Sequence, residues 1–336
     1  MNLLTMEHVS KAYTDRVLLD DVGFGINENE KIGVIGVNGM GKSTLLKIVA
    51  GIEESDAGTI SMGNQVKICY LPQTPVFEEG TTILRAATEG NYDELNRWTI
   101  EAEAKSMLNQ LGFTDYDEKI EHMSGGQKKR VALVRALLTP ADILVLDEPT
   151  NHLDNEMSEW LEEYLIQFRG AILMVTHDRY FLDRVVNRIV EVDHGKLYNY
   201  PGNYSEFVRL KAERQNMELA TERKRKSLLR TELEWLHRGA RARSTKQKAH
   251  IDRIHAMQEM KDIQEEKRVM LDSVASRMGN KTIKLSGICK SYGEKKLIED
   301  FSYIFLKKDR IGIIGHNGCG KSTLLKIING IVKPDA

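Results

Sequence analysis

Residues 36–44 read GVNGMGKST, and residues 315–323 repeat this pattern as GHNGCGKST. Each run follows a short apolar stretch, KIGVI at 31–35 and RIGII at 310–314, that reads as a buried strand. Each run also opens a helical pattern, STLLKIV in the first copy and STLLKII in the second. A strand, a glycine-rich turn and a helix in this order can surround a phosphate group with backbone N–H groups. The sequence therefore predicts two phosphate-binding loops in an α/β fold.

The residues of the first loop suit a nucleotide. Its glycines leave backbone N–H groups free to contact an anion, and the start of the helix adds the positive end of its dipole. Lys42 is expected to reach the β- and γ-phosphates, and the Ser43 hydroxyl to bind Mg²⁺. A chance glycine-rich turn is a poor alternative, because the whole pattern occurs twice. The predicted nucleotide-binding residues of the two loops are Gly36, Val37, Asn38, Gly39, Met40, Gly41, Lys42, Ser43, Thr44, Gly315, His316, Asn317, Gly318, Cys319, Gly320, Lys321, Ser322 and Thr323.

The composition limits the class of protein. The 336 residues suffice for about two domains of roughly 100–200 residues each. Acidic and basic residues number 49 and 48, so the net charge of −1 predicts neither a nucleic-acid nor a membrane partner by itself. The three cysteines are far apart and lack the spacing of a zinc site or a disulfide framework. With no apolar run near the roughly 18 residues of a membrane helix and no signal-peptide pattern, we expect a cytoplasmic protein.

The two loops belong to a longer internal repeat. Residues 3–57 align with residues 284–336, and KAYTDRVLLDDV in the first copy matches KSYGEKKLIEDF in the second. The first copy continues to about residue 195, whereas the second stops early, so we expect roughly 140 residues of a second domain to be absent.

Three further stretches of the first copy carry polar groups at the ends of predicted elements. CYLPQ at 69–73 reads as a strand end that leads into a loop, and residues 92–112 read as a mostly helical segment. MSGGQKKR at 123–130 leads into the helical pattern VALVRALL, so its serine and glycines form a second helix start that could bind an anion. Ser-Gly-Gly is also a common helix start without any function.

Two apolar strands end in groups that suit phosphate chemistry. ILVLDE at 143–148 places two carboxylates at a strand end, where Asp147 could hold Mg²⁺ through water and Glu148 could orient an attacking water. AILMVTH at 171–177 ends in His177, which the same reasoning places at the edge of the nucleotide site. A solvated acidic pair and a structural histidine are the alternatives.

With these motifs in this order, the chain resembles the ABC ATPases. The resemblance implies an α/β P-loop cassette that has a parallel-sheet core with antiparallel β and helical subdomains. It implies that ATP and Mg²⁺ are bound, that Tyr13 stacks on adenine, and that Tyr292 is the matching position of the second copy. It also implies that Gln73 is the Q-loop residue and that Asp154 belongs to the D-loop, with Met123 in place of the usual leucine before the signature. The resemblance assigns catalysis to Glu148, His177, Lys42 and Gln73, metal binding to Ser43, Gln73, Asp147 and Ser322, and the signature to Ser124, Gly125, Gly126 and Gln127.

Within this superfamily the chain looks like the ABC-F class, whose paired cassettes act on ribosomes. DEPTNHLD at 147–154 and THDRYFLD at 176–183 are the forms typical of that class. A long charged interval between the cassettes is the third shared feature. The expected domains are a first cassette at 1–204, a helical-hairpin linker at 205–275 and the start of a second cassette at 276–336.

The linker concentrates positive charge. We expect two helices of roughly 30 residues that turn near residues 237–243 and reach about 45 Å. Residues 223–253 hold eleven basic and three acidic residues, which gives a net charge of +8. A solvated helical face is the alternative, but contact with an RNA backbone explains this asymmetry better. The resemblance implies that the tip reaches toward the P-site tRNA and the peptidyl-transferase centre, and Trp235 could stack on a base or pack between the helices. The expected RNA-binding residues are Arg238, Arg241, Arg243, Lys246 and Lys248.

In the superfamily, ATP lies between the phosphate loop of one cassette and the signature of another. The Lys42 site therefore lacks a second signature in this chain, and the Lys321 site lacks its own carboxylates and histidine. We expect ATP binding with slow hydrolysis, and a head-to-tail homodimer through the first cassette could complete the sites. The open alternatives are the ATPase subunit of a membrane transporter and an RNA-binding or ribosome-binding fragment without turnover. The sequence does not distinguish a translation factor from an antibiotic-resistance protein.

Overall fold

The computed structural model describes residues 1–14, 16–91, 97–237, 252, 283–293, 295–306, 309–315 and 318–335. The chain divides into two compact units. One comprises Met1–Tyr204 with Arg277–Ala336, and the other comprises Ser205–Ser276.

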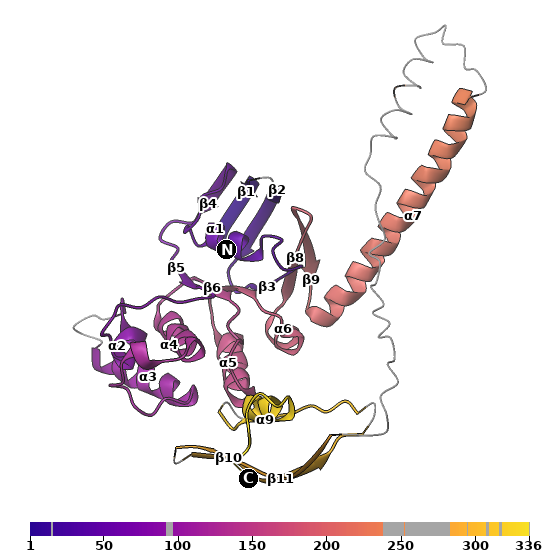
Figure 1. Ribbon diagram of the computed structural model, residues 1–336. Helices are drawn as coiled ribbons and strands as arrows, with labels where there is room; N and C mark the ends of the chain where they lie inside the picture. The colour runs from indigo at the N-terminus through magenta and orange to yellow at the C-terminus, as the bar shows by residue number, and fades with distance from the viewer. Residues whose placement is uncertain are drawn as a thin grey trace. The chain divides into compact units, whose positions relative to one another are not determined.

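A six-stranded sheet forms the centre of the first unit (Figure 1). Its strand order is β5-β6-β7-β3-β8-β9, in which the first five strands pair in parallel and β9 pairs antiparallel with β8. Every residue of β6 and β7 is buried, as expected for parallel strands covered on both faces. This parallel core confirms the fold class expected from the sequence. The strand bounds are β3 Lys31–Ile35, β5 Ile68–Leu71, β6 Ile143–Asp147, β7 Ala171–Val175, β8 Arg188–Asp193 and β9 Lys196–Pro201.

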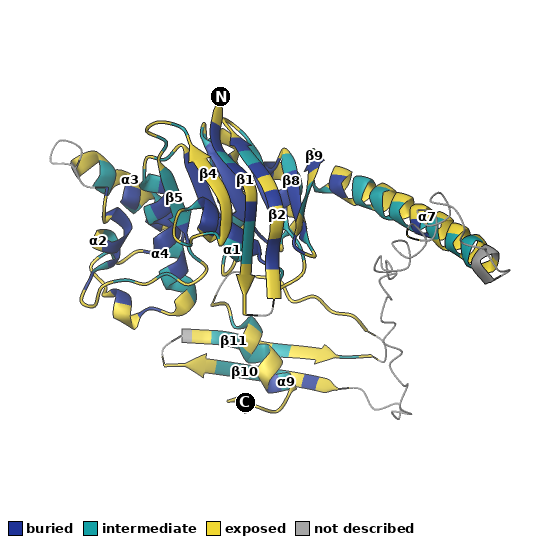
Figure 2. Ribbon diagram, turned by 90° about the horizontal axis from the view of Figure 1, so that it is seen from above, coloured by how far each residue is buried: buried dark blue, intermediate teal, exposed yellow. Residues whose placement is uncertain are grey.

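An antiparallel sheet of three strands packs beside this core. Its order is β2-β1-β4, with β1 at Asn2–Tyr13, β2 at Arg16–Asn27 and β4 at Ala57–Met62. Buried side chains of β1 and β2 join those of β3, β6, β7 and β8 in one apolar cluster, which α1 at Lys42–Val49 also enters. Figure 2 shows the alternation of buried and exposed residues along β1 and β2. The phosphate loop is therefore supported by both sheets.

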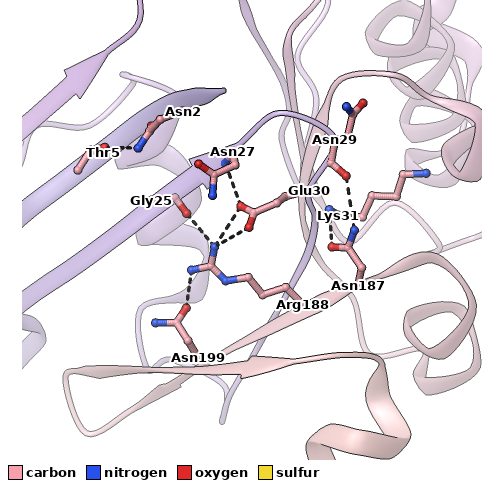
Figure 3. A network of polar contacts seen from close by, with 10 residues as sticks. All are labelled: Asn2, Thr5, Gly25, Asn27, Asn29, Glu30, Lys31, Asn187, Arg188 and Asn199. Carbon is pink, nitrogen blue, oxygen red and sulfur yellow. Dashed lines mark hydrogen bonds and ion pairs between the residues drawn. The ribbon is translucent and has the colours of Figure 1, made fainter.

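Polar contacts anchor the start of β3, the strand that leads into the first phosphate loop (Figure 3). The Arg188 guanidinium donates to Glu30 Oε2 at 3.1 Å and to the Gly25 carbonyl oxygen at 3.0 Å. The backbone N–H of Lys31 donates to Asn187 Oδ1 at 2.9 Å. These bonds tie β3 to the β2 end and to β8, which lie far apart in the sequence.

Helices form a second region of the cassette. Within it α2, α3 and α4 pack against one another, whereas α1 packs against β6 and β7. The predicted helix at 92–112 is confirmed over the range of α3, and residues 92–96 lie outside the described residues. The bounds are α2 Ile83–Thr88, α3 Arg97–Gln110, the 3-10 turn η1 Ile120–His122, α4 Gly125–Leu138, α5 Asn155–Gln167 and α6 Arg179–Val185.

The helix α7 spans Tyr204–His237. It has 34 residues, slightly more than the roughly 30 expected from the sequence. At 1.5 Å per residue its length is about 51 Å, compared with the expected length of about 45 Å. Ion pairs along it include Arg209–Glu213 at 2.9 Å and Arg225–Glu222 at 2.7 Å, at the spacings that support a helix. Apart from residue 252, the second predicted helix lies outside the described residues, as do residues 238–243 of the predicted turn and all five proposed RNA-binding residues.

The C-terminal part repeats local features of the first cassette. Strands β10 at Lys284–Tyr292 and β11 at Lys295–Ile304 pair antiparallel, and helix α9 spans Lys321–Ile328. The prediction of a buried strand at 310–314 is wrong, because these residues form no strand and Ile314 is 89% exposed. In the first cassette the equivalent strand β3 pairs with β7 and β8, whereas no strand among the described residues pairs with 310–314.

Candidate nucleotide site

The first phosphate loop joins β3 to α1 and requires glycine at two points. A Cβ on Gly36 would lie 2.5 Å from the Val192 carbonyl oxygen, so no side chain fits there. Gly41 caps the start of α1 with a φ of 98°, where an added Cβ would also lie 3.1 Å from Leu18 Cβ. These glycines allow the backbone to curve in front of the helix N-terminus, which is the geometry that binds phosphate.

Lys42 places its ammonium inside this loop. Its Nζ donates to the Gly36 carbonyl oxygen at 2.8 Å and to Asn38 Oδ1 at 3.2 Å. Burial lowers the pKa of Lys42, whereas the charges of Glu148 and Asp147 act in the opposite direction. The lysine therefore lies within electrostatic range of both carboxylates, as a residue that bridges phosphates and metal ligands would.

The two carboxylates at the end of β6 are buried. Asp147 is 1% exposed and Glu148 is 5% exposed. Asp147 Oδ1 and Glu148 Oε2 are buried and have no hydrogen-bond partner within the part of the chain that the structure describes. A buried carboxylate oxygen without a donor is costly, and oxygen ligands of this kind are what Mg²⁺ binds. The residues present therefore fit a magnesium ion, which Asp147 would hold.

The backbone of Glu148 is fixed, and its carboxylate has the properties of a proton acceptor. It adopts a left-handed conformation with φ 54°, and its backbone N–H donates to the Val175 carbonyl oxygen at 2.8 Å. Burial raises the pKa of Glu148, and the nearby His177 opposes that effect. A carboxylate with a raised pKa is the better acceptor of a proton from water.

His177 follows β7 and faces Glu148. Its Nε2 lies 3.3 Å from Glu148 Oε1, and the imidazole is 65% exposed. Beneath it, the Thr150 and Thr176 hydroxyls share a hydrogen bond of 2.7 Å, and Thr176 Oγ1 accepts the Asp178 N–H at 3.1 Å. These contacts join the loop after β6 to the loop after β7. The structure thus brings Lys42, Asp147, Glu148 and His177 into one site.

Tyr13 lies at the edge of this cassette. Its ring is half exposed, as a stacking surface for a base must be. Its hydroxyl donates to Glu53, and this bond raises the pKa of Tyr13. Gln73 lies just past β5 and is exposed.

The signature residues are placed at the start of α4. Ser124 caps the helix, accepts from the Gln127 N–H and completes a capping box with the Gln127 side chain. A Cβ on Gly126 would lie 3.0 Å from His152 Cβ, so the signature packs against the loop that follows Glu148. Asp154 caps α5 through the Met157 N–H at 3.1 Å. Among described residues no hydrogen bond or ion pair joins Ser124–Gln127 to the first phosphate loop.

The second copy repeats the local contacts of the first. Lys321 donates to the Gly315 carbonyl oxygen, and Gly320 caps α9 with φ 101°. Asp335 pairs with Lys290 at 2.5 Å, as Asp56 pairs with Lys11 at 2.9 Å. Gly318, Cys319, Ser322, Thr323 and Tyr292 are described, whereas His316 and Asn317 lie outside the described residues.

Sequence reasoning missed Arg16, which lies beside the first loop. Its Nη2 contacts Met40 Sδ at 3.3 Å, and its Nη1 lies 3.5 Å from the position of a Cβ on Gly39. The repeat could have revealed it, because the aligned residue of the second copy, Lys295, is also basic.

Comparison with known proteins agrees with this geometry. The family described as "ABC transporter" matches residues 19–151 and 298–336, and a second family with the same description matches residues 190–272. A solved structure of the ATP-binding subunit of an ABC transporter is 27% identical, with a TM-score of 0.54, and covers 59% of this chain and 90% of its own. A second, a dimeric post-hydrolysis ATP-binding cassette bound to ADP and Pi, is 23% identical with a TM-score of 0.53, covers 59% of this chain and 98% of its own, and shows the fold alone.

The curated relatives are similar over the whole chain. The ABC transporter ATP-binding protein YfmR of Bacillus subtilis is 42% identical over all of this chain and 59% of its own length. The energy-dependent translational throttle protein EttA is 37% identical in Haemophilus influenzae and 35% identical in Escherichia coli K12, over 99% of this chain and 67% of each relative. The chain thus spans about three fifths to two thirds of the length of these relatives.

The chain therefore belongs to the ABC ATPases. Within them it is a member of the ABC-F class, to which EttA belongs. Within the described residues, no helix is long and apolar enough to cross a bilayer.

Proposed function

We propose that the chain binds MgATP at the Lys42 site and hydrolyses it. The observation that carries this proposal is the pair of buried oxygens, Asp147 Oδ1 and Glu148 Oε2, which have no hydrogen-bond donor among described residues. They lie at a strand end within electrostatic range of Lys42. A site with unsatisfied acceptors and a buried ammonium suits a metal ion that bridges to phosphate oxygens.

Each residue has a separate role in this proposal. Lys42 binds the β- and γ-phosphates, and the loop N–H groups surround them. Ser43, Gln73 and Asp147 hold Mg²⁺, which supplies charge neutralisation at the phosphates when it is bound. Glu148 accepts a proton from the attacking water, and His177, 3.3 Å away, orients Glu148 and contacts the γ-phosphate. Tyr13 stacks on the adenine ring.

We further propose that the signature of another cassette completes the ATP site around Lys42. Ser124 to Gln127 form a helix start whose N–H groups at Gly125 and Gly126, which the capping box does not use, can contact a γ-phosphate from outside their own site. In this proposal, a head-to-tail homodimer through the first cassette is one arrangement that supplies that signature.

The first test separates binding from hydrolysis. ATP affinity is measured by calorimetry and phosphate release by a coupled assay, for wild type, Lys42→Ala and Glu148→Gln. The proposal predicts weakened affinity for Lys42→Ala. For Glu148→Gln it predicts retained affinity with hydrolysis slowed by about 10²–10⁴. Equal hydrolysis by wild type and Glu148→Gln would rule out the proposed role of this carboxylate.

We also propose a cytoplasmic role at the ribosome, close to the P-site tRNA. Two relatives carry names that refer to translation, and both align with this chain beyond the first cassette. The charge of +8 over residues 223–253 lies in the segment that includes the C-terminal part of α7. Lysine and arginine bind RNA phosphates regardless of base sequence.

A variant of the linker tests this contact. Arg238, Arg241, Arg243, Lys246 and Lys248 are changed together to Ala, and co-sedimentation with 70S ribosomes is compared with wild type. The control changes Arg209 and Lys211, basic residues near the start of α7 and outside residues 223–253, to Ala. Loss of co-sedimentation in the tip variant alone supports the proposal. Equal sedimentation of both variants would place the contact elsewhere, and binding only to membranes would favour a transporter subunit.

A further inference from the structure

Lys129 is a buried lysine to which the nucleotide chemistry above gives no role. It lies in α4, just after the signature residues, and is 4% exposed. Its Nζ donates to the Pro72 carbonyl oxygen at 2.5 Å and to the Asp147 carbonyl oxygen at 2.6 Å. A buried ammonium is costly unless its protons are hydrogen-bonded, so these two bonds determine where the side chain lies.

The two carbonyl groups belong to the ends of neighbouring strands. β5 and β6 pair in parallel as far as Leu71 and Leu146, and Pro72 and Asp147 are the next residues along each strand. Proline has no N–H to donate, so the ladder of hydrogen bonds cannot continue through Pro72. Lys129, on helix α4, donates hydrogen bonds to the carbonyl oxygens of both strand ends at this point.

The residues that follow these carbonyl groups belong to the proposed nucleotide site. Gln73 comes directly after Pro72, and Glu148 comes directly after Asp147. Burial lowers the pKa of Lys129 to about 8, and the negative charges of Asp147 and Glu148 oppose this effect. The Lys129 ammonium is therefore within electrostatic range of both carboxylates. One side chain is thus bonded to both segments that carry proposed metal ligands.

We propose that Lys129 is a positioning residue for the metal side of the nucleotide site. It holds the backbone of Gln73 and Asp147 at the spacing that lets them share one Mg²⁺. It also ties this spacing to α4, whose first turn carries the signature. The inference rests on the proposed function, since the metal is the one bound with ATP.

Two variants and a control test this role. Lys129→Met keeps the length of the side chain and removes the donors and the charge, whereas Lys129→Gln keeps an N–H donor. The control is Lys128→Met, a half-buried neighbour whose side chain makes no hydrogen bond or ion pair to a described residue. The affinity for ATP is measured with Mg²⁺ and with EDTA, and hydrogen exchange is followed by mass spectrometry without nucleotide.

The expected result is specific to the metal. ATP affinity in EDTA should stay near the wild-type value, because the Lys42 loop is untouched. The gain in affinity on adding Mg²⁺ should fall by about 10-fold or more in Lys129→Met, as is typical when groups that orient metal ligands are removed, and less in Lys129→Gln. Faster exchange should appear in the peptides that contain Gln73 and Glu148.

Other results overturn the inference. An unchanged gain from Mg²⁺ together with unchanged exchange in both Lys129 variants would show that Lys129 positions nothing. If Lys129→Met melts below the assay temperature, Lys129→Gln decides by the same criteria. A wild-type chain that binds no ATP would instead remove the proposed function, and the inference with it.

Discussion

The hydroxyl pair of Thr150 and Thr176 offers a quantitative test of how the two loops that carry Glu148 and His177 are joined. Thr176 is 4% exposed, shares a bond of 2.7 Å with Thr150 and accepts the Asp178 N–H at 3.1 Å. Valine conserves the shape of threonine and removes the hydroxyl. Thr150→Val therefore loses one hydrogen bond, and Thr176→Val loses two.

The magnitudes follow from this difference. At about 0.5–1.5 kcal/mol for each hydrogen bond, Thr150→Val should lower the free energy of unfolding by that amount and Thr176→Val by about 1–3 kcal/mol. The double variant should cost less than the sum, because the shared bond can be lost only once, and the coupling energy should be about 0.5–1.5 kcal/mol.

Urea unfolding of the four proteins measures this cycle. The control is Thr88→Val, whose buried hydroxyl donates to the Leu84 carbonyl oxygen at 2.8 Å within its own helix. Its effect should add to that of Thr150→Val within about 0.3–0.5 kcal/mol. A coupling energy near zero between Thr150 and Thr176, or a larger cost for Thr150→Val than for Thr176→Val, would refute the reasoning.

Two further predictions concern the loop glycines and the buried carboxylate. Gly41→Ala and Gly51→Ala both place a side chain at a positive φ, which costs about 1–2 kcal/mol, but only Gly41 has a neighbour, 3.1 Å from the new Cβ. Urea unfolding should show the larger loss for Gly41→Ala, which should also weaken ATP binding in calorimetry, and equal losses would contradict this. Because burial raises the pKa of Glu148, the folded state holds its proton to higher pH than the unfolded state, so stability falls as pH rises through that window. At neutral pH, Glu148→Gln should therefore have a larger free energy of unfolding than wild type, by about 1.4 kcal/mol for each unit by which the pKa of Glu148 is raised. The two proteins should be equally stable near pH 4. A stability difference that does not change with pH would contradict burial as the cause.

The local elements of the site could be predicted from the sequence. β3, the glycine turn and α1 follow one another directly, so apolar pattern and glycine spacing suffice to identify them. The same holds for β6 and β7, whose apolar runs end in Asp147 and His177. These strands are short, β6 and β7 are fully buried, and β3 is buried at its three central residues.

The contacts between distant segments could not be predicted in the same way. The apolar pattern at 310–314 matches that of β3, but a strand forms only where its neighbours are present, and those of β3 come more than 130 residues later. The bonds of Lys129 depend on which strands are adjacent and where their ladder stops. The hydroxyl pair of Thr150 and Thr176 likewise depends on the register of β6 with β7.

We propose that the two parts of the account are linked: ATP bound at the Lys42 site keeps this chain on the ribosome, and hydrolysis releases it. The most direct measurement is co-sedimentation of Glu148→Gln with 70S ribosomes in the presence of ATP, ADP or no nucleotide, with Lys42→Ala as the control that should not respond to ATP. The proposal predicts that Glu148→Gln accumulates on ribosomes with ATP and is released with ADP. The reason is that this variant binds ATP but cannot hydrolyse it, so it stays in the ribosome-bound state. Equal sedimentation under all three conditions, or none at all, would contradict it.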